Sequence, residues 1–472
     1  MKKNLICLLF CIYSFPAWSS DIDSVQVTEA GLPVLIIETV DGEWPTFKMA
    51  QKTDSTYIGN TILEAPKVPG RAYIKYKNKI IFDSQEYIKD SCGMTIRIRG
   101  NTSAFTDKQP YKIKLEKKAD MLCRGDDSIY KDKNWLLIKE KKLRNMIGFK
   151  INELTKLQWT PAFRYVNVIM NGDYRGVYIL IESVKRNTRC RLDVSDSGYI
   201  AEYDPYFWNE DVYIESALKW VTWLPMHYTF KYPDSDEITQ EQLDYFATYI
   251  DHVEDALHTL DYPDYIDVES FARWMIARDI LGNNDGAGSN IFFTKYDNTP
   301  NSKLKMANLW DLDGIMKNKD KWDEVHRKGI FYYFDLFEWS KNQDFKRMYK
   351  NIWRDEKDVI FDQMLTFLDD YAKSEEAVAM DKSIVLDNQR WNTDNDGVEM
   401  CINNAKDWFT TRKSWLQESI DDIYVGIENI QFDETEDMPV YYNLKGQRLT
   451  TPPTKGVFIK KTKNKKSHIL IK

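Results

Sequence analysis

Two polar segments in the second half of the chain carry side chains that can accept a proton and bind a metal ion. The first reads Asn-Asn-Asp-Gly-Ala-Gly-Ser-Asn and ends at Asn290, five residues after Asp285. The second reads Trp-Asp-Leu-Asp-Gly and contains Asp311 and Asp313. In a loop before a short strand, Asp285 could accept the proton of a hydroxyl while the amide oxygen of Asn290 reaches a metal ion. A carboxylate at the end of the next strand could complete the site, and such hard oxygen ligands suit Mg²⁺ or Mn²⁺.

This set of side chains fits phosphoryl transfer, whose barrier falls mainly through positioning and through neutralisation of negative charge. Asx and Gly residues also form ordinary turns, so the spacing alone does not decide the chemistry. A second match follows Arg278, where Asp279 is followed five residues later by Asn284. We place Asp279 on a helix, because Trp274 and Leu281 continue a helical pattern and a helix does not offer the required loop geometry.

Two cationic pairs flank a polar loop earlier in the chain. Arg97 and Arg99 share one face of the strand before residues 100–110, and Lys112 and Lys114 share one face of the strand after them. A phosphate-bearing ligand beneath the loop could use one lysine on its α- and β-phosphates. The alternative is a solvated strand face, and the loop lacks both the Gly-x-Gly-x-x-Gly and the Walker patterns.

The elements that must position these residues alternate between β-rich and helical regions, which predicts an α+β fold. Residues 25–82 form short β-rich runs, and Asn171 and Gly172 suit a tight hairpin. The further predicted elements are strands 94–99 and 111–115, helix 143–154, strands 163–170 and 174–184, helices over 246–260 and from about 267, strands 291–294 and 305–312, helices over 345–420, and strands 440–444 and 456–460.

Length and composition are those of a globular chain with a sizeable core. Of the 472 residues, 43% are hydrophobic and 29% are charged, which excludes a disordered or collagen-like chain. The net charge of −8 gives no general field that would attract nucleic acid or anionic lipid. Aromatic residues make up 14%, which fits aromatic cores and would also fit a sugar-stacking surface.

The N-terminal segment has the pattern of a secretory signal peptide. Lys2 and Lys3 precede an apolar stretch over residues 5–15, and small residues follow it. We therefore expect export and cleavage to a free N-terminus. After this segment no apolar run is long enough to span a membrane.

Removal of the signal peptide leaves an even number of cysteines in a compartment where disulfides persist. They are Cys92, Cys123, Cys190 and Cys401. Three pairings are open, and the pair Cys92 with Cys123 closes the shortest loop. The chain has no Cys-x-x-Cys pattern and its histidines are scattered, so we expect no structural zinc site.

Several segments, taken together and in order, resemble the spore-coat protein H (CotH) kinase family, an atypical branch of the protein-kinase-like fold. The resemblance spans about residues 94–314, with helical family-like sequence to about residue 420. The segments that match are residues 98–103, 108–115, 143–145, 165–167, 171–178 with Glu182, Asn284 and Asp285 with Asn290, and 310–313.

The resemblance implies a β-rich N-lobe, a helical C-lobe, and an ATP- and metal-dependent kinase reaction. By this resemblance Asp285 is the catalytic base, while Asn290 and Asp311 bind the Mg²⁺ or Mn²⁺ ion. Asp313 is the second candidate for the carboxylate ligand.

The same resemblance assigns nucleotide-binding residues. Lys112, or alternatively Lys114, would contact the nucleotide phosphates, with Arg99 beside them. Glu182 would lie near the interlobe hinge, and the alternative is an exposed carboxylate at the end of a strand.

We expect four parts in the chain. They are a signal peptide (residues 1–20), an N-terminal β region (21–90), a CotH-like kinase domain (91–425) and a C-terminal β-rich tail (426–472). The tail resembles the short β-rich C-terminal segments of exported Bacteroidetes proteins.

The resulting hypothesis is an exported kinase that moves the γ-phosphoryl group of ATP to a hydroxyl, on Ser or Thr of another exported protein. Its expected location is the periplasm, the cell surface or the extracellular space. One alternative is a non-catalytic surface or adhesion module that uses the same scaffold to bind glycan or protein. A second is a nucleotidyl transferase, which would use the same metal chemistry.

Overall fold

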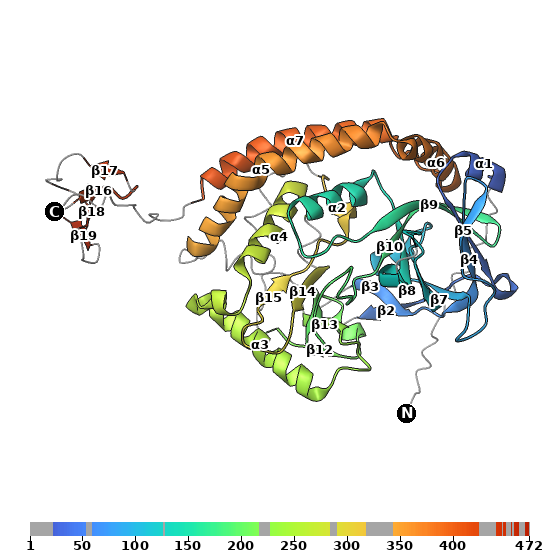
Figure 1. Cartoon of the computed structure of the whole chain (residues 1–472), viewed down its shortest axis with the longest axis horizontal. Helices are drawn as coiled ribbons and strands as arrows, with labels where there is room; N and C mark the ends of the chain where they lie inside the picture. The colour runs from blue at the N-terminus through green and yellow to red at the C-terminus, as the bar shows by residue number, and fades with distance from the viewer. Residues whose placement is uncertain are drawn as a thin grey trace, which may run out of the picture.

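The structure of the protein is a computed structural model. The residues that it describes are 22–52, 59–125, 128–216, 227–283, 290–317, 343–423, 440–445, 447–449, 455, 457–461 and 468–471. They form the mixed α and β fold that the sequence predicts (Figure 1). None of the described helices combines the length and the apolar character that crossing a membrane requires. The predicted signal peptide lies outside the described residues.

Seven strands close into a β-barrel. They follow the order β1-β9-β10-β8-β7-β6-β4, and β1 pairs both with β9 in parallel and with β4 in antiparallel, which closes the sheet. An additional strand, β5, pairs with β4. The strands are β1 (Val34–Thr39), β4 (Val68–Tyr76), β5 (Lys79–Asp83), β6 (Met94–Ile98), β7 (Tyr111–Ala119), β8 (Asp132–Lys139), β9 (Phe163–Met170) and β10 (Asp173–Glu182).

The barrel draws its strands from both sides of residue 90. β4 pairs with β6, and β1 pairs with β9, so the strands that precede residue 90 are neighbours of strands that follow it. The N-terminal β-rich residues and the first strands after them therefore share one sheet and one apolar interior. The sequence predicts the individual strands but not this closure.

Alternation of side chains gives the barrel an apolar interior and a charged exterior. In β6, Ile96 and Ile98 are buried, whereas Arg97 between them is partly exposed. In β7, Ile113 is buried, whereas its neighbour Lys112 is partly exposed. The predicted cationic strand faces are thus on the outside of the barrel.

The hairpin between β9 and β10 is confirmed. Asn171 and Gly172 have φ angles of 50° and 81°, the left-handed conformation that a tight two-residue turn requires. β9 and β10 pair directly, with Met170 opposite Asp173.

A second, five-stranded sheet with adjoining helices follows the barrel (Figure 1). Its strand order is β12-β13-β11-β14-β15. The strand predicted over residues 305–312 corresponds to β15, which is much shorter than expected. The strand ends at Met306, and the 3₁₀ helix η7 (Leu312–Gly314) follows further along the chain. The strands and helices are α2 (Arg144–Leu154), β11 (Tyr199–Asp204), β12 (Tyr213–Ile214), β13 (His227–Tyr232), α3 (Gln240–Thr259), α4 (Val268–Leu281), β14 (Ile291–Lys295) and β15 (Leu304–Met306).

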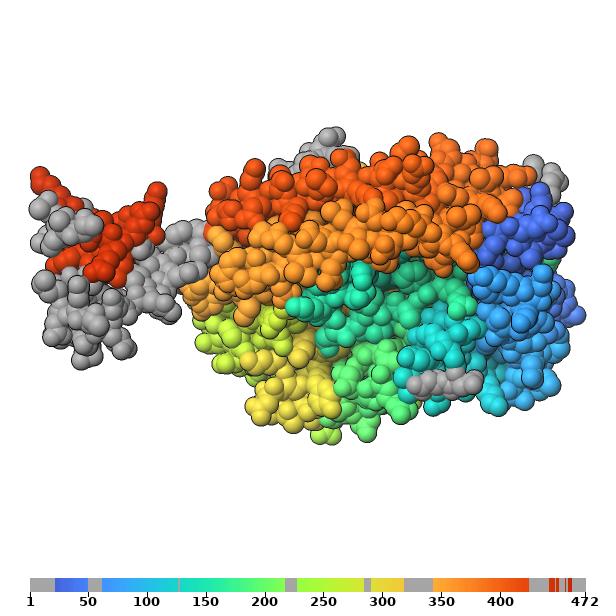
Figure 2. All heavy atoms as spheres, turned by 45° about the horizontal axis from the view of Figure 1, so that its top comes forward, coloured from blue at the N-terminus to red at the C-terminus, as the bar shows by residue number. Residues whose placement is uncertain are grey.

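Three long helices confirm the predicted helical region. They are α5 (Gln343–Ala372), α6 (Glu375–Trp391) and α7 (Val398–Asp421). α5 and α7 run side by side, and α6 continues this layer across β10 (Figure 1). Figure 2 shows these helices, in orange and red, covering one face of the molecule.

Smaller elements complete the described chain. The helix α1 (Ser24–Glu29) precedes β1, and β2 (Lys48–Lys52) pairs with β3 (Gly59–Glu64). Near the C-terminus, four short strands form an antiparallel sheet with the order β17-β16-β18-β19. They are β16 (Val440–Tyr442), β17 (Arg448–Leu449), β18 (Val457–Lys461) and β19 (His468–Ile471).

The four cysteines of the described chain are free thiols. Cys401 is buried, and the other three are partly exposed. Burial raises the pKa of Cys401 to about 12, so this thiol is protonated and inert at neutral pH.

Candidate active site

Asn290 and Asp311 meet at one edge of the second sheet. Asn290 immediately precedes β14, and Asp311 follows β15. Because these two strands are antiparallel, the start of one lies beside the end of the other. The Nδ2 atom of Asn290 donates a hydrogen bond of 3.2 Å to Oδ2 of Asp311. Two of the three residues predicted to form the catalytic and metal site are therefore in direct contact.

Both residues of this pair have left-handed backbone conformations. The φ angle is 60° at Asn290 and 55° at Asp311. Such angles are uncommon for residues other than glycine, and they concentrate at functional sites, where the surrounding structure holds them. Here they turn the chain sharply at the edge of the sheet.

Helix α2 holds the segment that carries Asp311 and Asp313. A Cβ atom added to Gly148 of α2 would lie 2.6 Å from Cδ1 of Leu312, so the helix and η7 are in close contact. The Nη1 atom of Arg144 also donates to the backbone carbonyl of Asp313 at 2.7 Å. The Asp313 side chain is exposed.

The predicted catalytic base, Asp285, lies outside the described residues, as do residues 284–289. The competing residue Asp279 lies on α4, as the sequence predicts. It is fully buried, and its carboxylate accepts a hydrogen bond from the hydroxyl of Tyr349. Asp279 thus binds a residue of the core helix α5, which indicates a structural rather than a catalytic role.

Arg99 and Lys112 form a half-buried cationic patch on the barrel. Neither side chain makes a hydrogen bond or a close ion pair with another residue that the structure describes. Burial lowers the pKa of Arg99, while the nearby charges of Asp311 and Glu202 act in the opposite direction. Burial and the neighbouring cations Arg97 and Arg99 lower the pKa of Lys112 to about 8. Desolvated cations of this kind favour an anionic ligand.

The alternative lysine, Lys114, has a different environment. Its side chain is exposed, and it lies one step further along the same face of β7. The structure therefore distinguishes the two lysines, because only Lys112 is held among other cations in a partly desolvated position.

A second charged group faces this patch and was not predicted from the sequence. Lys231 on β13 forms an ion pair of 2.7 Å with Glu202 on β11, and buried Asp204 follows on the same strand. Burial and the charge of Glu202 raise the pKa of Asp204 to about 7. The alternation of Glu202 and Asp204 about the buried Tyr203 was the available sequence signal, but it could not show which strand lies alongside.

The loop over residues 100–110 is tied to Lys139 at the end of β8. The Nζ atom of Lys139 donates to the hydroxyl of Thr106 at 2.8 Å and to the carbonyl of Ser103 at 3.5 Å. Burial lowers the pKa of Lys139, and the carboxylates of Asp313 and Asp311 partly offset this. The loop and the pair of Asn290 and Asp311 therefore share one electrostatic environment.

Glu182 ends β10 inside a network of ions rather than at the surface. It is 1% exposed, and its Oε1 atom lies 2.9 Å from Nη1 of Arg124 and 3.5 Å from Nε of Arg191. Its Oε2 atom accepts from the backbone N–H of Ala162 at 3.1 Å. The alternative of an exposed carboxylate is therefore wrong.

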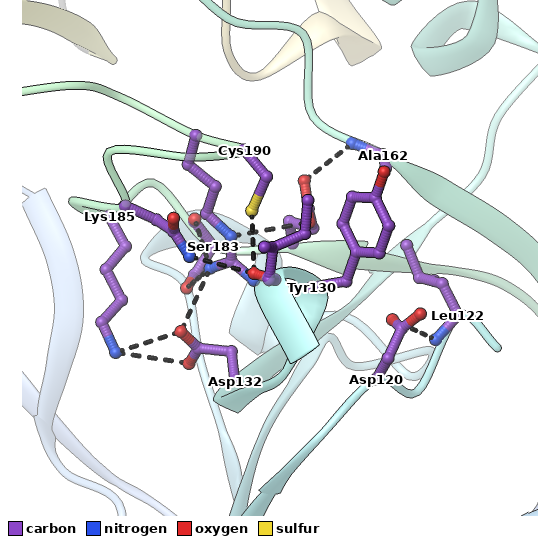
Figure 3. A network of polar contacts seen from close by, with 12 residues as sticks. Asp120, Leu122, Tyr130, Asp132, Ala162, Ser183, Lys185 and Cys190 are labelled. Atoms are coloured by element: carbon purple, nitrogen blue, oxygen red, sulfur yellow. Dashed lines mark hydrogen bonds and ion pairs between the residues drawn. The ribbon is translucent and has the colours of Figure 1, made fainter. Parts of the chain in front are cut away.

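Figure 3 shows further contacts of this network around Asp132, Lys185 and Cys190. The Oδ2 atom of Asp132, at the start of β8, lies 3.3 Å from Nζ of Lys185 and 3.7 Å from Nη1 of Arg191. The thiol of Cys190 donates to the carbonyl of Ile129. The network fastens the chain that leaves the barrel after β10 to the strands of the barrel itself.

The described residues contain no cluster of three or more His, Cys, Asp or Glu side chains with metal-binding geometry. The pair of Asn290 and Asp311 supplies one amide and one carboxylate, which are hard oxygen donors suited to Mg²⁺ or Mn²⁺. The third predicted member, Asp285, is outside the described residues. The donors that are described fit such an ion in their chemistry.

Comparison with protein families identifies the family of this chain. A family model described as CotH kinase protein matches residues 96–416, which is more than half of the chain. The chain therefore belongs to the CotH kinase family. No curated protein matches it significantly. The strands β1 and β4, which complete the barrel, precede the matched residues.

Proposed function

We propose that this protein is a metal-dependent kinase that transfers the γ-phosphoryl group of ATP to a hydroxyl. The observation that carries the proposal is the contact of Asn290 with Asp311 beside the half-buried cations Arg99 and Lys112. Two oxygen donors for a metal ion, beside half-buried cations that form no ion pair within the described part of the chain, suit a metal–polyphosphate ligand. Membership of the CotH kinase family supports the same reaction class.

Each proposed site residue has a separate part in this proposal. Asn290 and Asp311 hold the metal ion, and Asp313 lies close enough along the chain to serve as a substitute carboxylate. A bound Mg²⁺ or Mn²⁺ ion would neutralise charge on the phosphate oxygens. Asp285, five residues before Asn290, accepts the proton of the attacking hydroxyl.

The barrel supplies the cations for the nucleotide. Lys112 contacts the phosphates in preference to Lys114, because Lys112 is partly desolvated and Lys114 is exposed. Arg99 acts next to this lysine and the metal-binding pair, because its charge interacts with those of Lys112 and Asp311. A desolvated cation binds an anion more strongly than a solvated one, because less water competes.

Glu182 has a positioning role in the proposed kinase. Both of its oxygens are engaged by protein groups, so it fixes the chain between the barrel and the second sheet at the place of an interlobe hinge. In this proposal the barrel corresponds to the N-lobe of a kinase-like fold, and the second sheet with its helices corresponds to the C-lobe.

The N-terminal pattern of Lys2 and Lys3 before an apolar stretch supports export of the protein. The acceptor that we propose is a Ser or Thr hydroxyl on another exported protein. The location would then be the periplasm, the cell surface or the extracellular space.

Two measurements test the proposal. Calorimetry with ATP and Mn²⁺ should show binding that is lost without the metal ion. Incubation with γ-labelled ATP and an extract of surface proteins should then give labelled products whose mass gain equals one phosphate. Absence of nucleotide binding would instead favour the adhesion module, and a mass gain of a whole nucleotide would show nucleotidyl transfer.

A further inference from the structure

A bend in β10 presents backbone polar groups to helix α6. The pairing of β10 with β9 shifts register between Tyr174 and Gly176, and Gly176 has a φ angle of 97°. A β-bulge of this kind leaves backbone groups outside the ladder of the sheet. Figure 1 shows α6 at the edge of the barrel near β9, and α6 packs against β10.

The carboxylate of Asp387 on α6 occupies the bend. Its Oδ1 atom accepts from the backbone N–H of Val177 at 2.8 Å and from Nζ of Lys108 at 2.5 Å. A Cβ atom on Gly176 would lie 2.0 Å from this oxygen, so only glycine leaves room for it. The side chains of Asp387 and Lys108 are 8% and 13% exposed, so the ion pair is largely removed from water.

The next turn of α6 fixes the helix to the same hairpin. Nε of Arg390 donates to the carbonyl of Tyr174 at 2.9 Å, and its Nη2 atom lies 2.9 Å from the carboxylate of Asp173. Nε1 of Trp391 donates to the carbonyl of Arg175 at 3.2 Å. The helix is thus held in one register against the barrel, with or without its contact to Lys108.

Lys108 belongs to the loop over residues 100–110, which begins directly after Arg99. Adjacent to it, the carbonyl of Gln109 accepts from the hydroxyl of Tyr178 at 2.8 Å. The backbone N–H of Arg99 donates to the carbonyl of Pro110 at 3.1 Å, so the two ends of the loop are close together. A displacement of Lys108 would therefore also shift the position of Arg99.

We propose that Asp387 is a positioning residue that holds the loop over residues 100–110 in its nucleotide-binding conformation through Lys108. This inference rests on the proposed function, because it takes the loop to cover the phosphates of ATP. It assigns to α6, a helix far from the metal-binding pair in the sequence, control over nucleotide affinity.

The chemistry of the contact favours a positioning role for Asp387 over a role that only attaches α6 to the barrel. A buried ion pair is weak support for stability, because the cost of removing both charges from water offsets much of their attraction. The main contribution of such a pair is a defined geometry. Here Oδ1 of Asp387 binds both the backbone N–H of Val177 in the bulge and the side chain of Lys108 in the loop. Arg390 and Trp391 already attach the helix.

The variant Asp387→Asn tests the proposal, because it keeps an oxygen for Val177 but removes the charge that holds Lys108. The matched control is Asp381→Asn on the same helix. Asp381 accepts from the backbone N–H of Val398 at 2.6 Å, so this variant weakens a contact of α6 that does not involve the loop.

Two readouts on the full chain are compared. Asp387→Asn should raise the KM for ATP about tenfold with kcat nearly unchanged, because uniform nucleotide binding is lost. It should also speed hydrogen exchange of the amides of residues 100–110. Asp381→Asn should change neither quantity. Equal KM values and equal exchange in Asp387→Asn and wild type would overturn the proposal.

The exchange measurement keeps the inference separate from the proposed function. If the wild-type protein transfers no phosphate, faster exchange in the loop of Asp387→Asn still supports its positioning role, and unchanged exchange still refutes it. Should Asp387→Asn fail to fold, Lys108→Gln gives the same test with the contact between Asp387 and Val177 intact.

Discussion

The side-chain amide of Asn290 donates to the carboxylate of Asp311 across the edge of an antiparallel strand pair. The two residues are distant in the sequence, and both adopt left-handed backbone angles at which a side chain is disfavoured. Each such residue costs about 1 kcal/mol or more relative to an unstrained conformation. Strain retained at two contacting polar residues is typical of a functional site.

Loss of the Asp311 carboxylate should weaken metal binding. Asp311→Asn keeps the shape of the side chain, and we expect Mn²⁺ affinity to fall by about 100-fold, since even losses outside the ligand set cost about 10- to 100-fold. Calorimetric titration with Mn²⁺ measures the change. Asp313→Asn is the comparison variant, because Asp313 is the second candidate carboxylate and lies two residues away. A larger loss in Asp313→Asn would transfer the ligand role to Asp313.

Nucleotide binding should take up a proton near pH 8. Lys112 has a pKa of about 8 in the free protein because burial and neighbouring cations disfavour its charged form. Phosphates would favour that form and raise the pKa, so ATP affinity should fall as the pH rises above about 8. Calorimetry in two buffers of different ionisation enthalpy measures the uptake. Lys112→Met should remove it, whereas Lys114→Met should leave it unchanged.

Gly148→Ala should damage the site although it improves a helix. Alanine in a helix normally gains about 1 kcal/mol over glycine. Here the added methyl group would press on Leu312, which is the neighbour of Asp311 in the sequence. We expect reduced transfer activity and no gain in melting temperature. Glu153→Ala, on the exposed side of α2, should retain full activity. If the Gly148→Ala variant is more stable and fully active, η7 can move away from the added methyl group without disturbing the site.

Glu182→Gln should destabilise the protein strongly. The neutral amide leaves Arg124 and Arg191 with one fewer counter-charge in a buried network, and such losses cost about 3 kcal/mol or more. Chemical denaturation measures the free energy of unfolding. Glu64→Gln, which removes the charge from an exposed pair with Lys48, is the control and should show little change. Equal stability of the two variants would mean that the network in Figure 3 is dispensable.

Local patterns in the sequence predicted most of the elements but not their arrangement. Alternation identified β6 and β7, and Asn171 with Gly172 identified the hairpin, because these signals depend on neighbouring residues. The closure of the barrel depends on the parallel pairing of β1 with β9, which the alternation of each strand does not specify. The end of β15 at Met306 likewise could not be predicted from the local pattern, because mostly apolar residues continue after Met306 to Leu312.

The candidate site was predictable where residue types are unusual and unpredictable where ordinary charged residues are brought together. Asn290 ends a polar, glycine-rich segment, and Asp311 belongs to an Asp-Leu-Asp-Gly run, and both patterns are distinctive in the sequence. Lys231, Glu202 and Asp387 are ordinary residue types in ordinary strands and helices. Their importance arises from partners that only the folded chain supplies, such as Lys108 for Asp387.

The most direct test of the proposed reaction is transfer from γ-labelled ATP by wild type and by Asp285→Ala. Asp285 is the proposed base, and its removal should nearly abolish labelling while the melting temperature and Mn²⁺ binding stay close to wild type. Asp311→Ala should lose labelling together with Mn²⁺ binding. Transfer at the wild-type rate in both variants would contradict the assignment of these carboxylates to a kinase site.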